Sequence, residues 1–194
     1  MGKYLLESRG IETKWQPTDN TKPVPMLKKR LSGNQIIIAY LRKVKSFTHY
    51  IVKQAITAKL ANKQFKVTGG TIRLTKNKKS IDFIFEIIRR EEEWQSKLAE
   101  RMKLYQDFYA NFQEGDSGFP SIPQLILVCE DDKHMVETYK EIIVSGLEIK
   151  QIKLYFTSDL EQNAEDLTES LSEFKIDEET KKYKVVKTNL KLLE

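Results

Sequence analysis

Two carboxylates within one apolar run are the residues of this sequence whose type and spacing could do chemistry. Asp82 and Glu86 lie among isoleucines and phenylalanines in the stretch 80–88. Carboxylates on one face of a strand are typical ligands of divalent ions that activate water. Four residues of strand separate the two acids by about 13 Å, too far for both to hold one ion directly. We therefore expect Asp82 near the exposed end of a strand and Glu86 to be a buried or paired acid. Its candidate partners are Arg89, Arg90 and Lys97.

A second acidic group, Glu130-Asp131-Asp132, follows an apolar stretch and has two interpretations. It could be a metal-binding strand end, or a helix cap followed by a solvated first turn. We favour the cap, because neither His49 nor His134 has other ligands at metal-site spacing. Gly69-Gly70 is followed by neither a phosphate-loop nor a dinucleotide-binding pattern. We expect no metal site and no cofactor.

The cations of the chain gather in its first part. Residues 1–79 hold 18 Lys/Arg and 3 Asp/Glu, an excess of 15 positive charges, whereas residues 80–194 have an excess of 10 negative charges. A field of one sign indicates a polyanionic partner such as DNA, although lysines can also only solvate a surface. The candidate DNA-binding residues are Lys28, Lys29, Arg30, Arg42, Lys43, Lys45, Lys76, Lys78 and Lys79.

Composition excludes several classes of protein. With 194 residues, 40% hydrophobic and 31% charged, the chain is typical of a globular domain. No apolar run approaches the length that spans a bilayer, and we identify no signal peptide, so we expect no membrane partner and a cytoplasmic location. Cys129 is the only cysteine, which excludes intramolecular disulfides and favours a buried thiol.

Elements that would position these residues follow from periodicity. The three prolines between 17 and 25 predict an irregular basic arm over 1–33. Apolar residues at helical spacing predict a long helix from about 35 to 62, with the stripe formed by Ile37, Leu41, Val44, Ile51 and Ala55. Strands are expected at 64–67 and 71–75, a tight turn at 76–79, and a buried central strand at 81–88.

The second half predicts parallel crossover units. A helix at 91–113, with an aromatic stripe that favours a core role over base stacking, separates the strand 81–88 from another at 124–129. We expect these two strands to be adjacent and parallel. A helix at 133–144 and a strand at 152–156 follow. The domains would be the arm 1–33, an α/β core at 34–160, and an acidic then basic extension at 161–194 that could add an edge strand.

The order of these elements resembles the restriction-endonuclease-like, or PD-(D/E)XK, fold, an α/β mixed sheet flanked by helices. More narrowly, the stretch from 64 to 160 resembles the replication-relaxation family of plasmids and mobile elements. The resemblance lies in three parts of the chain: Thr68-Gly69-Gly70-Thr71-Ile72-Arg73-Leu74 with Asp82-Phe83-Ile84-Phe85-Glu86, the tyrosine-rich helix through Tyr105 and Tyr109, and Phe119-Pro120 with Cys129-Glu130-Asp131.

The resemblance also implies a catalytic set that this sequence lacks. Active members place an Asp before the second core strand, where this chain has Thr68-Gly69-Gly70, and a Lys two residues after the acid of the third, where it has Ile88. Only Glu86 is left as a remnant. We therefore expect a non-cleaving DNA-binding accessory protein of plasmid or mobile-element replication or conjugation, with replication or transfer proteins as further partners. The alternatives are an active metal-dependent DNA nuclease and a protein-interaction scaffold.

Overall fold

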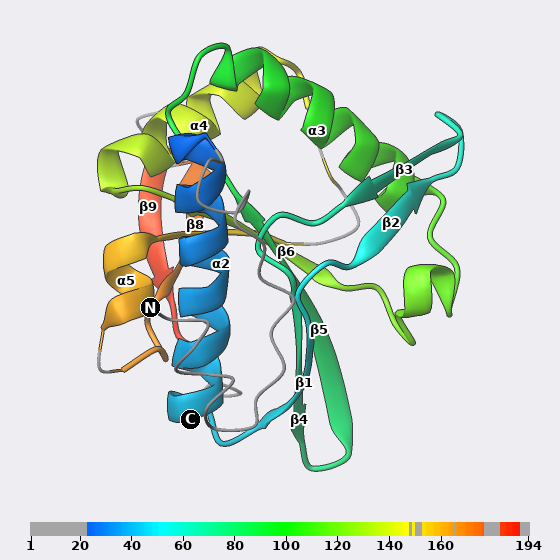
Figure 1. Cartoon of the computed structure of the whole chain (residues 1–194), viewed down its shortest axis with the longest axis vertical. Helices are drawn as coiled ribbons and strands as arrows, with labels where there is room; N and C mark the ends of the chain where they lie inside the picture. Colours follow the sequence, from blue (N-terminus) through cyan, green and yellow to red (C-terminus); the bar gives the residue numbers. More distant parts are fainter. Residues whose placement is uncertain (1–22, 148, 150–152, 165, 177–182, 191–194) are drawn as a thin grey trace, which may run out of the picture.

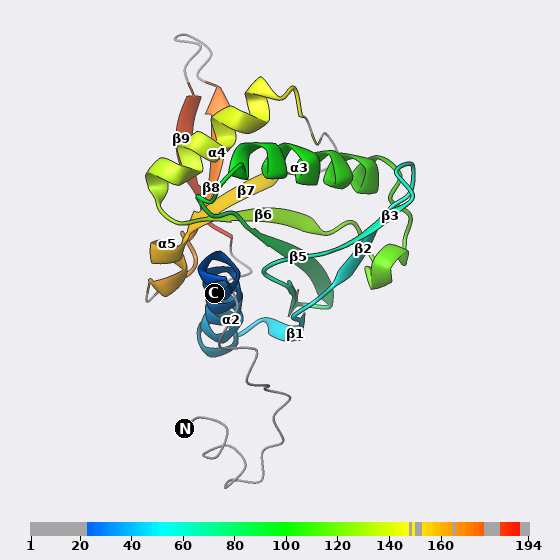
Figure 2. The same ribbon diagram turned by 45° about the horizontal axis from the view of Figure 1, so that its top comes forward.

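The chain forms a three-layer α/β structure around one mixed sheet (Figure 1). The computed structural model describes residues 23–147, 149, 153–164, 166–176 and 183–190. Helices α3 (Trp94–Ala110) and α4 (Asp132–Val144) cover one face of the sheet, while α2 (Val24–Lys43) and α5 (Asp159–Asn163) lie on the other (Figure 2). The expected α/β class with a mixed sheet is confirmed.

The sheet has seven strands in the order β1-β4-β5-β6-β7-β8-β9. Their bounds are β1 Phe47–Ile51, β4 Thr71–Lys76, β5 Lys79–Ile87, β6 Gln124–Cys129, β7 Leu154–Ser158, β8 Leu171–Ile176 and β9 Tyr183–Thr188. The pairs β5–β6 and β6–β7 are parallel, and the other neighbours are antiparallel. A separate hairpin of β2 (Ala55–Ala58) and β3 (Lys63–Lys66) is inserted between β1 and β4.

The central part of the prediction is confirmed. Strand β5 pairs in parallel with β6, with Ile84 opposite Leu125, and α3 connects the two strands. Strands β4 and β5 form a tight hairpin whose two turn residues, Asn77 and Lys78, both have positive φ. Two positive φ angles in a two-residue loop are typical of a type I′ turn, which matches the twist of the strands.

The predicted helix from 35 to 62 is wrong at both ends. Helix α2 begins at Val24, so residues 24–33 of the expected irregular arm are helical, with Pro25 in the first turn, where its missing N–H costs nothing. The helix ends at Lys43, and 47–51 pairs as β1 with β4 because its aromatic and β-branched residues fit a pleated sheet. Residues 1–22 of the expected arm lie outside the described residues.

The core has one apolar cluster on each face of the sheet. Leu98, Met102, Tyr105 and Tyr109 of α3 are buried against β5 and β6, which confirms that the aromatic stripe belongs to the core. On the other face, α2 packs Ile36, Tyr40 and Val44 against Phe83, Phe85 and other residues of the sheet. Cys129 is buried in β6, as expected, and burial raises the pKa of its thiol to about 12.

No helix within the described parts of the chain has both the length and the apolar character that a membrane span requires.

Candidate nucleic-acid interface

Glu86 is a buried acid whose charge is matched inside the fold. It lies on the central strand β5 and faces α3, where Arg101 donates to its two oxygens from Nε at 3.0 Å and Nη2 at 3.1 Å. The hydroxyl of Tyr105 donates to the same carboxylate at 2.7 Å. Burial, and then the charge of Glu86, raises the pKa of Tyr105 well above 10, so this hydroxyl remains a donor. The interpretation of Glu86 as a buried, paired acid is confirmed.

The prediction of a partner for Glu86 was wrong. The partner is Arg101, and not Arg89, Arg90 or Lys97. Arg101 lies on the inner side of α3, with its guanidinium carbon 4.4 Å from the centre of the Phe65 ring. It also donates to the backbone carbonyl of Lys66. The guanidinium is thus held between the β2–β3 hairpin and β5, where cation–π contact and ion pairing add together.

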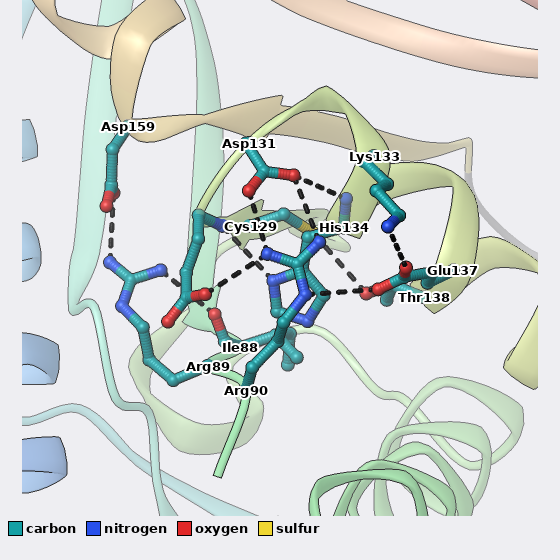
Figure 3. Close-up of polar contacts among 11 residues, drawn as sticks. Ile88, Arg89, Arg90, Cys129, Asp131, Lys133, His134, Glu137, Thr138 and Asp159 are labelled. Atoms are coloured by element: carbon teal, nitrogen blue, oxygen red, sulfur yellow. Dashed lines mark hydrogen bonds and ion pairs between the residues drawn. The ribbon is translucent and has the colours of Figure 1, made fainter.

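Arg89 and Arg90 instead connect the ends of the parallel strands to neighbouring elements (Figure 3). Arg89 is buried and donates to Asp159 at 2.9 Å, at the start of α5. Arg90 donates to Asp131 at 2.7 Å and also reaches Glu130 and Glu137. These arginines hold α4 and α5 against the carboxyl end of β5.

The acidic group after β6 is a helix cap, as favoured. Asp131 is the N-cap of α4, and its side chain accepts the backbone N–H of His134 at 2.7 Å. The hydrogen bond from Arg90, followed by that from His134, lowers the pKa of Asp131 to about 2. Over the residues described, no group of three or more His, Cys, Asp or Glu side chains is arranged to hold a metal ion.

Asp82 departs from the expectation of an exposed strand end. Its side chain is buried and accepts from Arg73, directly opposite on β4, through Nε at 2.8 Å and Nη2 at 3.0 Å. A bidentate pair across two strands matches the charge that burial would otherwise leave alone. Asp82 and Glu86 therefore each have a partner of their own and do not form a joint site.

Thr68-Gly69-Gly70 continues the strand pairing beyond the start of β4. Gly69 donates to the Phe85 carbonyl at 2.8 Å, and the amide of Ile87 donates to the Thr68 hydroxyl at 2.7 Å. A side chain at Gly69 would place its Cβ 2.6 Å from the Phe85 oxygen, so only glycine fits. A Cβ added at Gly33 of α2 would lie 3.4 Å from the Cα of Gly69. Helix α2 therefore approaches the strand ends closely at this point.

The hollow between α2 and α3 is lined mostly by cations. A cavity of about 280 Å³ above Glu86 is lined by five cations and two carboxylates: Lys29, Lys66, Arg89, Lys97, Arg101, Glu86 and Glu91. Lys29 is paired with Glu91 at 2.6 Å. An adjoining cavity of about 520 Å³ shares Lys29, Lys66 and Thr68 with the first and adds Arg30 and Lys53. We call the two cavities together the α2–α3 groove.

No protein-family model matches the chain, and neither a curated protein nor a solved structure is significantly similar to it.

The structure divides the predicted DNA-binding residues among three places. Lys29 and Arg30 line the α2–α3 groove, and Lys28 lines a neighbouring cavity of about 330 Å³. Arg42, Lys43 and Lys45 lie at the other end of α2, where Lys43 donates to the carbonyls of Asn163 and Ala164. Lys76, Lys78 and Lys79 lie at the tip of the β4–β5 hairpin, away from the groove (Figure 1).

Sequence reasoning missed five cations of the groove, two of which, Arg89 and Lys97, it considered only as partners of Glu86: Lys53, Lys66, Arg89, Lys97 and Arg101. Lys53 was missed because it was assigned to the predicted helix 35–62. Lys66 was missed because the short predicted strand 64–67 suggested no site. A signal for Arg101 was present in the spacing of the helix. Arg101 comes three residues after Leu98 and four before Tyr105, so it lies on the buried side of its helix.

Proposed function

We propose that this protein binds DNA in the α2–α3 groove without cutting it. The observation that carries the proposal is the pairing of the Glu86 carboxylate with Arg101. Its carboxylate is placed in a cationic groove, but the guanidinium of Arg101 takes the position that a metal ion would need. The groove keeps an excess of positive charge, which suits the phosphate backbone of DNA.

The order of elements supports a degenerate restriction-endonuclease-like core. In the chain, α2 is followed by β1, β4, β5, α3 and β6, with the β2–β3 hairpin inserted after the first strand. Strand β4 then corresponds to the second core strand and β5, which carries Glu86, to the third. At the start of β4 the Thr68 hydroxyl accepts a backbone amide, so no carboxylate stands where an active member has its aspartate.

The resemblance of 64–160 to the replication-relaxation family supplies the biological setting. We propose that the protein is an accessory factor in the replication or transfer of a plasmid or mobile element. DNA contacts that position a protein on the phosphate backbone carry no sequence information, so we expect little sequence preference from the groove alone.

A salt titration of duplex binding tests the groove. The double variant Lys53→Glu/Lys66→Glu should weaken binding at least tenfold and make the slope of log K against log salt shallower by about 2, because each phosphate contact contributes roughly 0.9. The matched control is Lys103→Glu/Lys140→Glu, which makes the same charge change at exposed positions of α3 and α4 outside the groove. Equal losses in the two variants would contradict a groove-specific site.

A plasmid-nicking assay with Mg²⁺ or Mn²⁺ tests the absence of cleavage. The expected result is no nicking by the intact protein. Metal-dependent nicking that disappears in Glu86→Ala would establish the alternative, an active nuclease, because contaminating nucleases do not depend on that residue.

A further inference from the structure

The outer face of α2 carries apolar side chains that cover nothing in the described structure. Leu31, Ile38 and Leu41 are 66%, 52% and 58% exposed. Together with neighbours at alternating spacings of three and four residues they form one line, which we call the α2 seam: Val24, Leu27, Leu31, Asn34, Ile38 and Leu41. Such spacing places all six on one side of a helix.

The α2 seam lies opposite the side of the helix that packs into the core. Ile36, Tyr40 and Val44 face the sheet and are buried. Figure 2, which views α2 nearly along its axis, shows the sheet on one side of the helix and no described element on the opposite side. The seam is thus a second apolar face, which the fold of the described residues does not use.

The width of the α2 seam points to another helix as its occupant. A stripe confined to alternating third and fourth positions is the narrow contact line of a coiled coil, whereas helices that lie on membranes have wider apolar faces with Trp or Phe. The seam contains no aromatic residue. An apolar centre also makes this face unsuitable for the phosphates of DNA.

Charge distinguishes between the helices that could occupy the seam. Lys28 and Arg42 are exposed beside it, and α2 contains no Asp or Glu. A second copy of this chain would bring like charges together at the flanks of the contact, which disfavours self-pairing. A partner with acidic flanks would complete the ion pairs.

We infer that the α2 seam binds an amphipathic helix of a partner protein, with apolar residues at matching spacing and Glu or Asp along the flank that would face Lys28 and Arg42. Asn34, in the middle of the seam, favours a partner with a polar residue opposite it, since such a residue fixes the register of paired helices. The inference does not rest on the proposed DNA binding, although Asn34 of the seam also lines the second cavity of the α2–α3 groove.

A synthetic helix tests the inference directly. The probe is a fluorescein-labelled peptide of three heptads with Leu along one line, one Asn in its middle, and Glu on both flanks. The full chain should bind it by fluorescence anisotropy. Leu31→Glu/Ile38→Glu should weaken binding at least tenfold, whereas the matched control Leu60→Glu/Val144→Glu, at exposed apolar sites elsewhere, should change it less than twofold. Unchanged circular dichroism checks that each variant folds.

Three results would overturn the inference. The first is no binding of the acidic probe at up to about 100 μM, the affinity range of only weak complexes. The second is equal binding of a probe with Lys on its flanks. The third is a concentration-dependent dimer in sedimentation velocity that Leu31→Glu/Ile38→Glu abolishes, because the occupant would then be a second copy of the chain.

Discussion

Arg101 and Glu86 form a buried ion pair whose two members depend on each other. The side chain of Glu86 is 4% exposed and that of Arg101 is 19% exposed. Removing one member of such a pair leaves an uncompensated charge in a medium of low dielectric, while removing both is much less costly.

Arg101→Met should therefore lower the free energy of unfolding by about 3 kcal/mol. Arg101→Met/Glu86→Gln should recover most of that loss, since a neutral amide at position 86 still accepts from Tyr105. Chemical denaturation of the two variants measures the difference. Equal stability of the single and double variants would show that the ion pair does not hold the charge of Glu86.

Asp131 makes stability depend on pH in the acid range. Its folded pKa of about 2 lies below its ordinary value of 3.8, so its contribution is fully present above about pH 4 and is lost as the pH falls through 2. Because the side chain is 45% exposed, solvent screening limits the contribution to roughly 0.5–1 kcal/mol.

The variant Asp131→Asn keeps an N-cap but removes the titrating group. It should be less stable than the original protein at pH 6, and most of this difference should be gone at pH 2, as measured by urea unfolding at both values. A stability difference that stays constant with pH would contradict this assignment.

At the scale of elements, the sequence was informative where the pattern was local. The apolar runs at 81–88 and 124–129 and the helix between them are continuous segments, so their parallel pairing could be predicted. The end of α2 could not, because β1 exists through pairing with β4, whose residues are 20 or more positions away. The same applies to the site: Glu86 stood out as an acid in an apolar run, but its pairing with Arg101 depends on how α3 is turned toward β5.

The β4–β5 turn offers a prediction at this scale. Lys78 has φ of 63° in a type I′ turn, a conformation that glycine adopts without steric cost. Lys78→Gly should raise the free energy of unfolding by about 0.5–1 kcal/mol. Lys79→Gly, at the first residue of β5, should lower it by a similar amount, because glycine weakens a strand. Thermal unfolding of both variants gives the comparison, and stabilisation by both would contradict the role of φ.

At the scale of the molecule, the predicted DNA-binding cations and those of the groove fall, among the described residues, into separate groups rather than one continuous surface. The α2–α3 groove, the carboxyl end of α2 and the β4–β5 tip each hold several of them. A duplex in the groove would be close to the first group and remote from the third (Figure 1).

Two variants with equal charge change separate these groups. Lys53→Glu/Lys66→Glu should weaken DNA binding at least tenfold more than Lys78→Glu/Lys79→Glu at the same salt concentration, in a mobility-shift assay. Long-range electrostatics alone would make the two losses equal, since both variants change the net charge by the same amount. A larger loss in the tip variant would move the interface to the β4–β5 hairpin.

The close contact of Gly33 with Gly69 has a consequence for the energetics of binding. A Cβ added at Gly33 of α2 would lie 3.4 Å from both the Gly69 Cα and the Ile87 side chain, and the hydrogen bonds of Gly69 and Ile87 fix the floor beneath. The amides of the floor should therefore exchange with solvent only when the whole sheet opens, while the exposed side chains of Lys53 and Lys66 at the rim can reorient. A duplex bound there as proposed would contact a floor that is already ordered, so the entropy lost on binding should come from lysine side chains and not from the backbone.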